Sequence, residues 1–165
     1  MGFSRSTWAV IFAVLPIVAS GIEIGEPIPK CPMQSLAKDT PVSVPQLQGK
    51  VLYVDFWASW CGPCAQSLPF MSQLQAELKG KGLQILAVNL DEDAKDAEKF
   101  LAANPVQLDF VTAPEGKCPE LYGVQAMPTS FLIDRKGKVR HIHSGFRPTD
   151  KDEIRSKILA LLDEK

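Results

Sequence analysis

The sequence predicts an α/β domain built on a central mixed β-sheet with helices on both faces, preceded by an extended or hairpin extension. Two apolar runs, VLYVDFWA (51–58) and LQILAVNL (83–90), have the length and composition of buried strands. Each run is followed by a segment in which apolar residues recur at helical spacing. Two later strand patterns flank a turn, which adds an antiparallel hairpin and makes the sheet mixed.

The first 20 residues differ in character from the rest of the chain. MGFSRS carries one positive charge, TWAVIFAVLPIVAS is almost wholly apolar, and small residues close the segment at Ala19, Ser20 and Gly21. This three-part layout is typical of a secretory signal peptide. The apolar core is shorter than the roughly 20 residues that span a bilayer. We therefore expect residues 1–20 to be a signal peptide, with a retained N-terminal anchor as the alternative, and residues 21–165 to form one domain.

The first half of the domain predicts a leader and two strand–helix units. Residues 21–50 carry five of the 13 prolines, which favours an extended leader or a short hairpin. Strand 51–58 follows, and GKG at 80–82 ends the helix behind it. The apolar face of that helix consists of Ala65, Leu68, Met71, Leu74 and Leu78. Strand 83–90 and a charged amphipathic helix over 91–103 come next.

The second half predicts five further elements. They are, in order, a short strand (108–111), a short helix (118–122), two strands (130–134 and 138–145) and a final helix (149–163). The two strands flank Arg135-Lys136-Gly137, which is a hairpin signal. Thr149 or Asp150 can cap the final helix. We expect His141 and His143, which alternate along the last strand, to be ordinary strand residues.

Composition and charge exclude several classes of function. The chain is 45% hydrophobic and 22% charged, as in soluble globular proteins. Its net charge is −1 and it has no basic run, so we expect no nucleic-acid partner. We also expect a monomer that needs no metal and no organic cofactor. The four cysteines, all beyond the predicted signal, are Cys31, Cys61, Cys64 and Cys118.

Cys61 and Cys64 stand two residues apart in WASWCGPC, and such a pair has three physical uses. A zinc site needs two more ligands, usually a second close pair, whereas Cys31 and Cys118 are isolated in the sequence. A structural disulfide across so short a loop stabilises little, because stabilisation grows with loop length. Reversible dithiol chemistry is the third use, and the surroundings of the pair favour it.

The pair lies where a predicted strand ends and a helix begins. We expect Cys61 at the helix N-terminus, where free backbone N–H groups and the helix dipole stabilise the thiolate that attacks a disulfide. Pro63 suits the first helical turn, where its missing N–H costs nothing. Cys64, one turn further on, is expected to be more buried. The sequence therefore predicts that Cys61 attacks first and that Cys64 resolves.

Asp55 is a second indication of chemistry. It stands within the apolar run VLYVDFWA, six residues before Cys61, where an unpaired charge is expensive to bury. It is a candidate proton acceptor for Cys64, acting directly or through water. The alternative is an acid at a strand edge with an ordinary partner.

The residues around the pair resemble the thioredoxin superfamily. VDFWASWCGPC is similar to the active-site segment of that family, Pro69 to its helix-kinking proline, and AMPTSFLID to its cis-proline loop. The resemblance extends from about residue 24 to residue 162 and implies a thioredoxin fold with a cis Met127–Pro128 bond opposite the first cysteine. The residues that we expect at the substrate-binding surface are Trp60, Gly62, Pro63, Met127, Pro128 and Thr129.

Within that superfamily the chain resembles the periplasmic TlpA-like reductases, which include ResA-type and cytochrome c maturation members. The resemblance rests on GEPIP, LQGKVLYVDFWASWCGPCAQSLP and ILAVNLDED. In those proteins an acid after the second long strand can lie near the CxxC, and Glu92 matches that place; the alternative is a solvated acid at a helix start. TlpA-like proteins commonly carry Asn where this chain has Asp55. The proton-handling group is therefore Asp55, Glu92 or both.

Cys31 and Cys118 remain after the CxxC pair is set aside. In an oxidising compartment two such cysteines in one domain most often pair, so we expect a structural Cys31–Cys118 disulfide. The alternatives are a second redox centre that relays electrons and two free thiols.

The sequence therefore predicts an exported, periplasmic thiol-disulfide oxidoreductase that reduces protein disulfides through Cys61 and Cys64. Reduction is favoured because Gly-Pro between the cysteines resembles reducing members. A periplasmic reductant needs an electron donor, and the resemblance implies a membrane protein of the DsbD type. Cytochrome c maturation and general thiol homeostasis are both open as its role. The alternatives are a disulfide oxidase or isomerase, and a non-enzymatic metal- or haem-assembly partner that uses the same cysteines.

Overall fold

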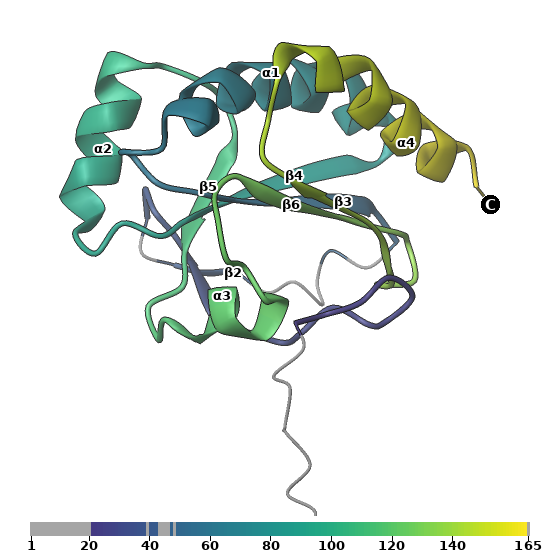
Figure 1. Ribbon diagram of the computed structural model, residues 1–165, viewed down its shortest axis with the longest axis horizontal. Helices are drawn as coiled ribbons and strands as arrows, with labels where there is room; N and C mark the ends of the chain where they lie inside the picture. Colours follow the sequence, from purple (N-terminus) through teal and green to yellow (C-terminus); the bar gives the residue numbers. More distant parts are fainter. Residues whose placement is uncertain (1–20, 39, 43–46, 48, 165) are drawn as a thin grey trace, which may run out of the picture.

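A seven-stranded mixed β-sheet forms the centre of the computed structural model, which describes residues 21–38, 40–42, 47 and 49–164 (Figure 1). The strands are β1 (Met33–Ser35), β2 (Pro41–Val42), β3 (Val51–Trp57), β4 (Leu83–Asn89), β5 (Asp109–Thr112), β6 (Thr129–Ile133) and β7 (Val139–Ser144). Their order across the sheet is β2-β1-β5-β4-β3-β6-β7. β3, β4 and β5 are parallel, whereas β1, β2, β6 and β7 join by antiparallel pairing.

Within the described part of the chain, four α-helices cover the two faces of the sheet. They are α1 (Gly62–Leu78), α2 (Ala94–Ala103), α3 (Lys117–Tyr122) and α4 (Lys151–Asp163). In Figure 1, α1, α2 and α4 lie on one face, and α3 lies on the other with the purple N-terminal segment. This arrangement confirms the predicted mixed sheet with helices on both faces.

The central strand β3 separates two parts of the core because its side chains alternate between the faces. Leu52, Val54 and Phe56 belong to a cluster that also contains residues of α3 and the N-terminal extension. Tyr53 packs on the opposite face among residues of α1 and α4, and Trp57 on that same face packs beside the start of α1. The helix that follows β3 therefore begins above the same face to which Asp55 points.

The N-terminal extension forms the predicted hairpin at the sheet edge, where β1 pairs with β2 and with β5. The predicted signal peptide or anchor, residues 1–20, lies outside the described residues, as do residues 39, 43–46 and 48 of the leader. Within the part of the chain that the structure describes, no helix is both long and apolar enough to cross a membrane.

Two helix starts differ from the sequence predictions. The helix expected from residue 91 begins at Ala94, because the carboxylate of Asp93 accepts a hydrogen bond from the Lys95 amide and caps the helix there. The final helix begins at Lys151, after a 3₁₀ turn over Pro148–Asp150. Asp150 does not cap α4 through its side chain; its carboxylate accepts a hydrogen bond from the Arg147 amide instead.

Candidate active site

The CxxC pair stands at the junction of β3 and α1, as the sequence predicts. Cys61 is the N-cap of α1, with extended backbone, and its Sγ accepts a hydrogen bond from the Cys64 amide at 3.2 Å. That contact places the sulfur on the free N–H groups of the helix start, where negative charge on sulfur is stabilised. Pro63 lies in the first turn and Pro69 inside the helix.

The two sulfurs form a disulfide with an S–S distance of 2.04 Å, so the structure is that of the oxidised protein. Cys64 is fully buried, whereas Cys61 retains 5% of its surface. Both pack in a cluster with Trp57, Ala58, Leu68 and Ala87. Only Cys61 is open to an incoming group, which fits the predicted order of attack.

Asp55 is fully buried on the face of the sheet that carries this cluster. It lies two residues before Trp57 on β3, and its register partner on β4 is Ala87, another member of the cluster. The Ser130 hydroxyl donates a hydrogen bond to Oδ1 of Asp55 at 2.5 Å, while Oδ2 has no hydrogen-bond partner among the described residues. The structure therefore brings a carboxylate with one free oxygen alongside the buried sulfur site.

Burial sets the proton affinity of this carboxyl group. It raises the pKa of Asp55 to about 7, against the smaller opposing effect of the Ser130 hydrogen bond. An acid with a pKa near neutrality exchanges protons readily under working conditions. Burial, and after it the charge of Asp55, raises the pKa of Tyr53 on the same strand, so its hydroxyl stays protonated.

The proline loop before β6 lies against the cysteines. The Met127–Pro128 peptide bond is cis, and the Met127 side chain packs on the cluster that holds Cys61 and Cys64. Thr129 is buried, and its hydroxyl donates a hydrogen bond to the Ala126 carbonyl at 2.8 Å. The loop is thus fixed beside the disulfide, where the sequence predicts it.

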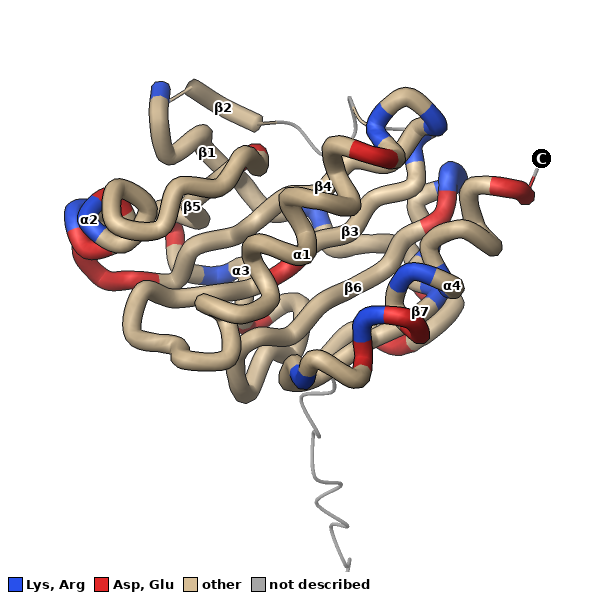
Figure 2. The backbone as a smooth tube through the Cα atoms, turned by 90° about the horizontal axis from the view of Figure 1, so that it is seen from above, with Lys and Arg blue, Asp and Glu red and all other residues tan. Residues whose placement is uncertain are grey.

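The surface around Cys61 is apolar and uncharged. Trp60 is 72% exposed, and Gly62 and Pro63 are also exposed. Helix α1 carries no charged residue before Glu77, and its first turns are tan in Figure 2. Trp60, Gly62, Pro63 and the Met127 loop therefore form an uncharged, largely apolar rim around Cys61.

Glu92 is exposed, and the acid that reaches the active-site loop is its neighbour Asp91. The Asp91 carboxylate accepts hydrogen bonds from the amide and hydroxyl of Ser59, each at 3.0 Å, and from the Asn89 side chain at 2.8 Å. The sequence analysis missed this contact. A signal was available, because Ser59 and Asp91 follow two neighbouring parallel strands, whose carboxyl ends meet at one edge of a sheet.

Cys31 and Cys118 form a disulfide, the pair that the sequence analysis expected. It joins the leader before β1 to the first turn of α3, across 87 residues of sequence. Both cysteines pack in the cluster on the α3 face of the sheet with Met33 and Tyr122.

Comparison with known proteins agrees with this geometry. A protein-family model described as Redoxin matches residues 23–159. The chain belongs to the Redoxin family. That family assignment covers the whole sheet from the first described strand to the middle of α4, and so includes both disulfides.

Relatives of this Redoxin protein are named as thiol-disulfide oxidoreductases. ResA of Oceanobacillus iheyensis is 30% identical over 151 residues, which cover 88% of this chain and 79% of that protein. ResA of Geobacillus thermodenitrificans is 37% identical over 98 residues, which cover 59% of this chain and 56% of that protein. A crystal structure of a Chlorobium tepidum protein assigned as thiol:disulfide interchange protein DsbE is 49% identical, with a TM-score of 0.81, and covers 86% of this chain and 99% of that one.

These similarities confirm the thioredoxin fold and the TlpA/ResA-like resemblance. The Redoxin chain is a thiol-disulfide oxidoreductase, with Cys61 and Cys64 as the pair placed for the exchange.

Proposed function

We propose that the protein works outside the cytosol as a reductase of protein disulfides. The observation that carries the proposal is the asymmetry of the pair: Cys61 Sγ lies on the helix N-terminus and Cys61 retains 5% of its surface, whereas Cys64 is fully buried. Such an arrangement favours a thiolate at one sulfur and protects the other from solvent.

The reduced protein acts in two exchange steps. The Cys61 thiolate attacks one sulfur of a substrate disulfide, so that a Cys61–substrate disulfide forms and one substrate thiolate leaves. Cys64 then attacks Cys61 and releases the second substrate thiolate, which leaves the Cys61–Cys64 disulfide seen in the structure. The substrate gains two electrons, and the pair loses two.

Asp55 handles the proton of the second step. Cys64 must lose its proton before it attacks, and the free Oδ2 of Asp55 is an acceptor on the same buried face. The pKa of Asp55, raised to about 7 by burial, matches this task because a carboxylate of ordinary pKa would be a weaker base.

The proposal also covers export, electron supply, oligomeric state and substrates. Residues 1–20 direct export, a membrane protein of the DsbD type returns two electrons to Cys61–Cys64, and the protein acts as a monomer. Its substrates are disulfides of apocytochrome c or other exported proteins. The DsbE-like and ResA-like similarities support this assignment of compartment and partner class.

The reduction potential of the Cys61–Cys64 couple tests the direction of electron flow. It can be followed by the fluorescence of Trp57, which packs against the pair, in thiol–disulfide buffers of stated ratio. A value near the thioredoxin end, about −270 mV, supports a reductase, whereas one near −120 mV means that the protein donates disulfides and overturns the proposal. A variant with Cys31→Ala and Cys118→Ala isolates the signal of the CxxC pair.

A further inference from the structure

Three buried polar atoms without a hydrogen-bond partner lie together on the α4 face of the sheet. They are the Tyr53 hydroxyl oxygen, Asp55 Oδ2 and His143 Nε2. Only five side-chain atoms of this kind occur within the described residues. Buried polar groups are normally paired, so a concentration of unpaired ones points to a local function or to bound water.

The strand register places these groups in one row. Asp55 on β3 lies directly opposite Ser130 on β6, and Ser130 lies directly opposite His143 on β7. Residues opposite one another in neighbouring strands project from the same face. Ser130 already donates a hydrogen bond to Asp55 Oδ1, so the row begins with a formed contact.

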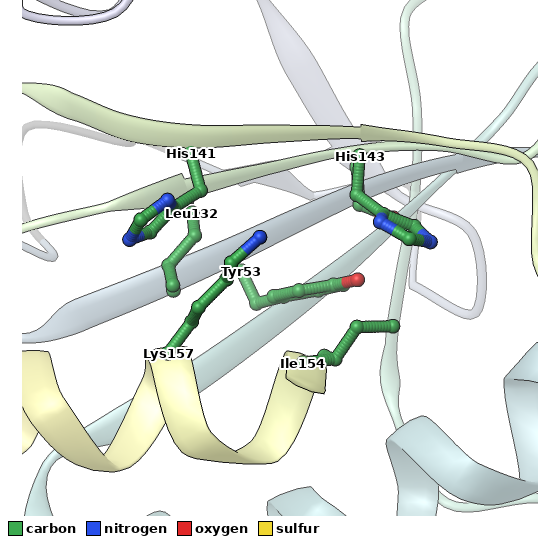
Figure 3. Close-up of a pocket in the computed structure, with 7 residues that line it drawn as sticks. Tyr53, Leu132, His141, His143, Ile154 and Lys157 are labelled. Atoms are coloured by element: carbon green, nitrogen blue, oxygen red, sulfur yellow. The ribbon is translucent and has the colours of Figure 1, made fainter. Parts of the chain in front are cut away.

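A small cavity of about 10 Å³ joins the other members of the row. Tyr53, Ser130 and His143 line it, and Ile154 and Lys157 of α4 close it from outside (Figure 3). In Figure 3 the Tyr53 hydroxyl is directed to the His143 end of the cavity, away from His141. This volume suits about one water molecule, for which the three polar side chains supply partners.

His143 connects the cavity to the surface. Its side chain is 23% exposed, and its Nε2 lies 3.4 Å from Asp150 Oδ2, at ion-pair distance without hydrogen-bond geometry. The other ionisable groups near this row are His141 of β7, Glu153 and Lys157 of α4, and Tyr53 and Asp55 of β3. Asp150 and Glu153 place negative charge beside the imidazole.

We propose that Ser130 and His143, with one water between them, form a proton path from the buried carboxyl group of Asp55 to solvent. This inference rests on the proposed function, in which Asp55 takes the proton of Cys64. The Ser130 hydroxyl donates to the ionised carboxylate; once Asp55 is protonated, this hydroxyl turns to the water and its oxygen accepts from the carboxylic O–H. Asp55 then gives its proton to the Ser130 oxygen, Ser130 passes its own to the water, and the water passes one to His143 Nε2. Because Nε2 is buried, the imidazolium then releases the proton of its other ring nitrogen, Nδ1, to solvent.

The need for such a path follows from the burial of Asp55. A carboxyl group without solvent contact that holds a proton must lose it before it can take the proton of Cys64. At a pH near the pKa of Asp55, about 7, part of the protein enters the resolving step in this protonated form. Imidazole is the side chain that changes protonation most readily between about pH 5 and pH 8. The sequence analysis treated His143 as an ordinary strand residue, because its partner across the sheet could not be read from the sequence.

His141, two residues earlier on β7, offers a matched comparison. It lies on the same face and lines the same cavity, yet its partner across the sheet is the apolar Leu132. Burial and the nearby Lys157 lower the pKa of His141, so this imidazole holds a proton less readily. His141 therefore lies beside the proposed path but is not part of it.

The test measures the resolving step in His143→Ala, His141→Ala and the wild-type protein. The reduced protein is mixed with dithiobis-nitrobenzoate at a pH near the pKa of Asp55, about 7. Cys61 attack releases one thionitrobenzoate and Cys64 attack the second, so that the two steps appear as separate absorbance phases. The second phase is then repeated with added imidazole, and with pyrazole as a ring of similar size that is a far weaker base.

We expect His143→Ala to slow the second phase by about tenfold, below the roughly 10²–10⁴-fold contribution of a directly acting acid–base group, and to leave the first phase unchanged. Imidazole restores the rate and pyrazole does not, while His141→Ala behaves as wild type. A normal second phase in His143→Ala, or equal rescue by both rings, overturns the path and leaves Cys61–Cys64 exchange intact. A wild-type protein with no second phase overturns the proposed function itself.

Discussion

The Asp91 carboxylate holds Ser59 from two sides, through the backbone amide and through the hydroxyl, both at 3.0 Å. Ser59 lies in the short segment between β3 and α1, immediately before Trp60 and Cys61. The contact therefore ties the active-site segment to the end of β4, which lies beside β3 in the sheet. Asn89 adds a third hydrogen bond to the same carboxylate.

Asp91→Asn is expected to loosen this segment. An amide cannot accept all the hydrogen bonds that the carboxylate accepts, and each charge-assisted bond contributes about 1.5–3 kcal/mol. Hydrogen exchange of the Ser59 amide should become faster, and the attack of Cys61 on a small disulfide should slow. Asp93→Asn, which removes a charge at the start of α2 but keeps a side chain able to cap the helix, is the control. Unchanged exchange at Ser59 would show that the segment is held by its other contacts.

Asp55→Asn should change the pH dependence of stability. Because the pKa of Asp55 is raised from 3.8 to about 7, the folded protein holds a proton between these values that the unfolded chain releases. The wild-type free energy of unfolding therefore falls as pH rises through this window. The variant does not titrate in this window, so its free energy of unfolding should rise relative to that of the wild type, by roughly a few kcal/mol, as the pH rises through it.

Denaturant unfolding of the oxidised proteins from about pH 4 to pH 8 measures this difference, since the disulfide removes any thiol titration. Asp96→Asn, an exposed acid on α2, is the control and should run parallel to the wild type. A constant difference between Asp55→Asn and wild type across the range would mean that Asp55 is ionised in the folded protein throughout.

Cys64→Ser should trap the first intermediate. Without the resolving sulfur, the Cys61–substrate disulfide persists, and it can be isolated from a mixture of oxidised exported proteins and identified by mass spectrometry. Cys61→Ser, with the buried Cys64 as its remaining thiol at this site, should give no adducts. Equal adduct formation by both variants would contradict the order of attack.

Trp60→Ala should lower the rate of exchange with protein substrates but not with small disulfides. The exposed indole offers contact area to a polypeptide but is not needed for the chemistry at sulfur, and tryptophans of this kind often dominate protein interfaces. We expect a several-fold lower rate with a disulfide-bonded protein and an unchanged rate with a small disulfide. Gln66→Ala, at an exposed residue in the first turns of α1, is the control. Equal losses on both substrates would assign Trp60 to the reaction itself.

Replacing Cys31 and Cys118 by alanine should lower stability but not exchange activity. A cross-link over 87 residues contributes about 4–5 kcal/mol in the chain-entropy model. The double variant should unfold at lower denaturant concentration, and its Cys61–Cys64 exchange below that concentration should match the wild type. Loss of exchange in a folded variant would instead favour an electron relay through this second pair.

The sequence predicted the central elements closely because their signals are local. VLYVDFWA and LQILAVNL read as buried strands, and β3 and β4 end within one residue of the predicted bounds. The predicted start of α2 was wrong by three residues, because the acidic residues before the helix make other contacts. Asp91 accepts hydrogen bonds from Ser59, and Asp93 caps the helix. A run of acidic residues resembles the first turn of a helix even where single residues of the run make other contacts.

The residues of the candidate site also divide into those that local motifs predict and those that only the folded sheet brings together. Cys61, Cys64 and the Met127 loop could be recognised from contiguous motifs, and the structure brings them together. Ser130 and Asp91 escaped notice, because their partners lie 75 and 32 residues away in the sequence and are brought to them only by strand register. Pairings of this kind depend on which strands become neighbours, a property of the whole sheet.

The two disulfides occupy opposite sides of the sheet, and this separation makes them selectively reducible. Cys61–Cys64 packs beside Trp57 on one side, while Cys31–Cys118 packs with Val54 and Phe56 on the other. A dithiol that docks at the Trp60 rim meets only the first bond, with the full thickness of β3 and its neighbours between it and the second. The Cys61–Cys64 pair can therefore be reduced and reoxidised repeatedly while the Cys31–Cys118 disulfide stays intact.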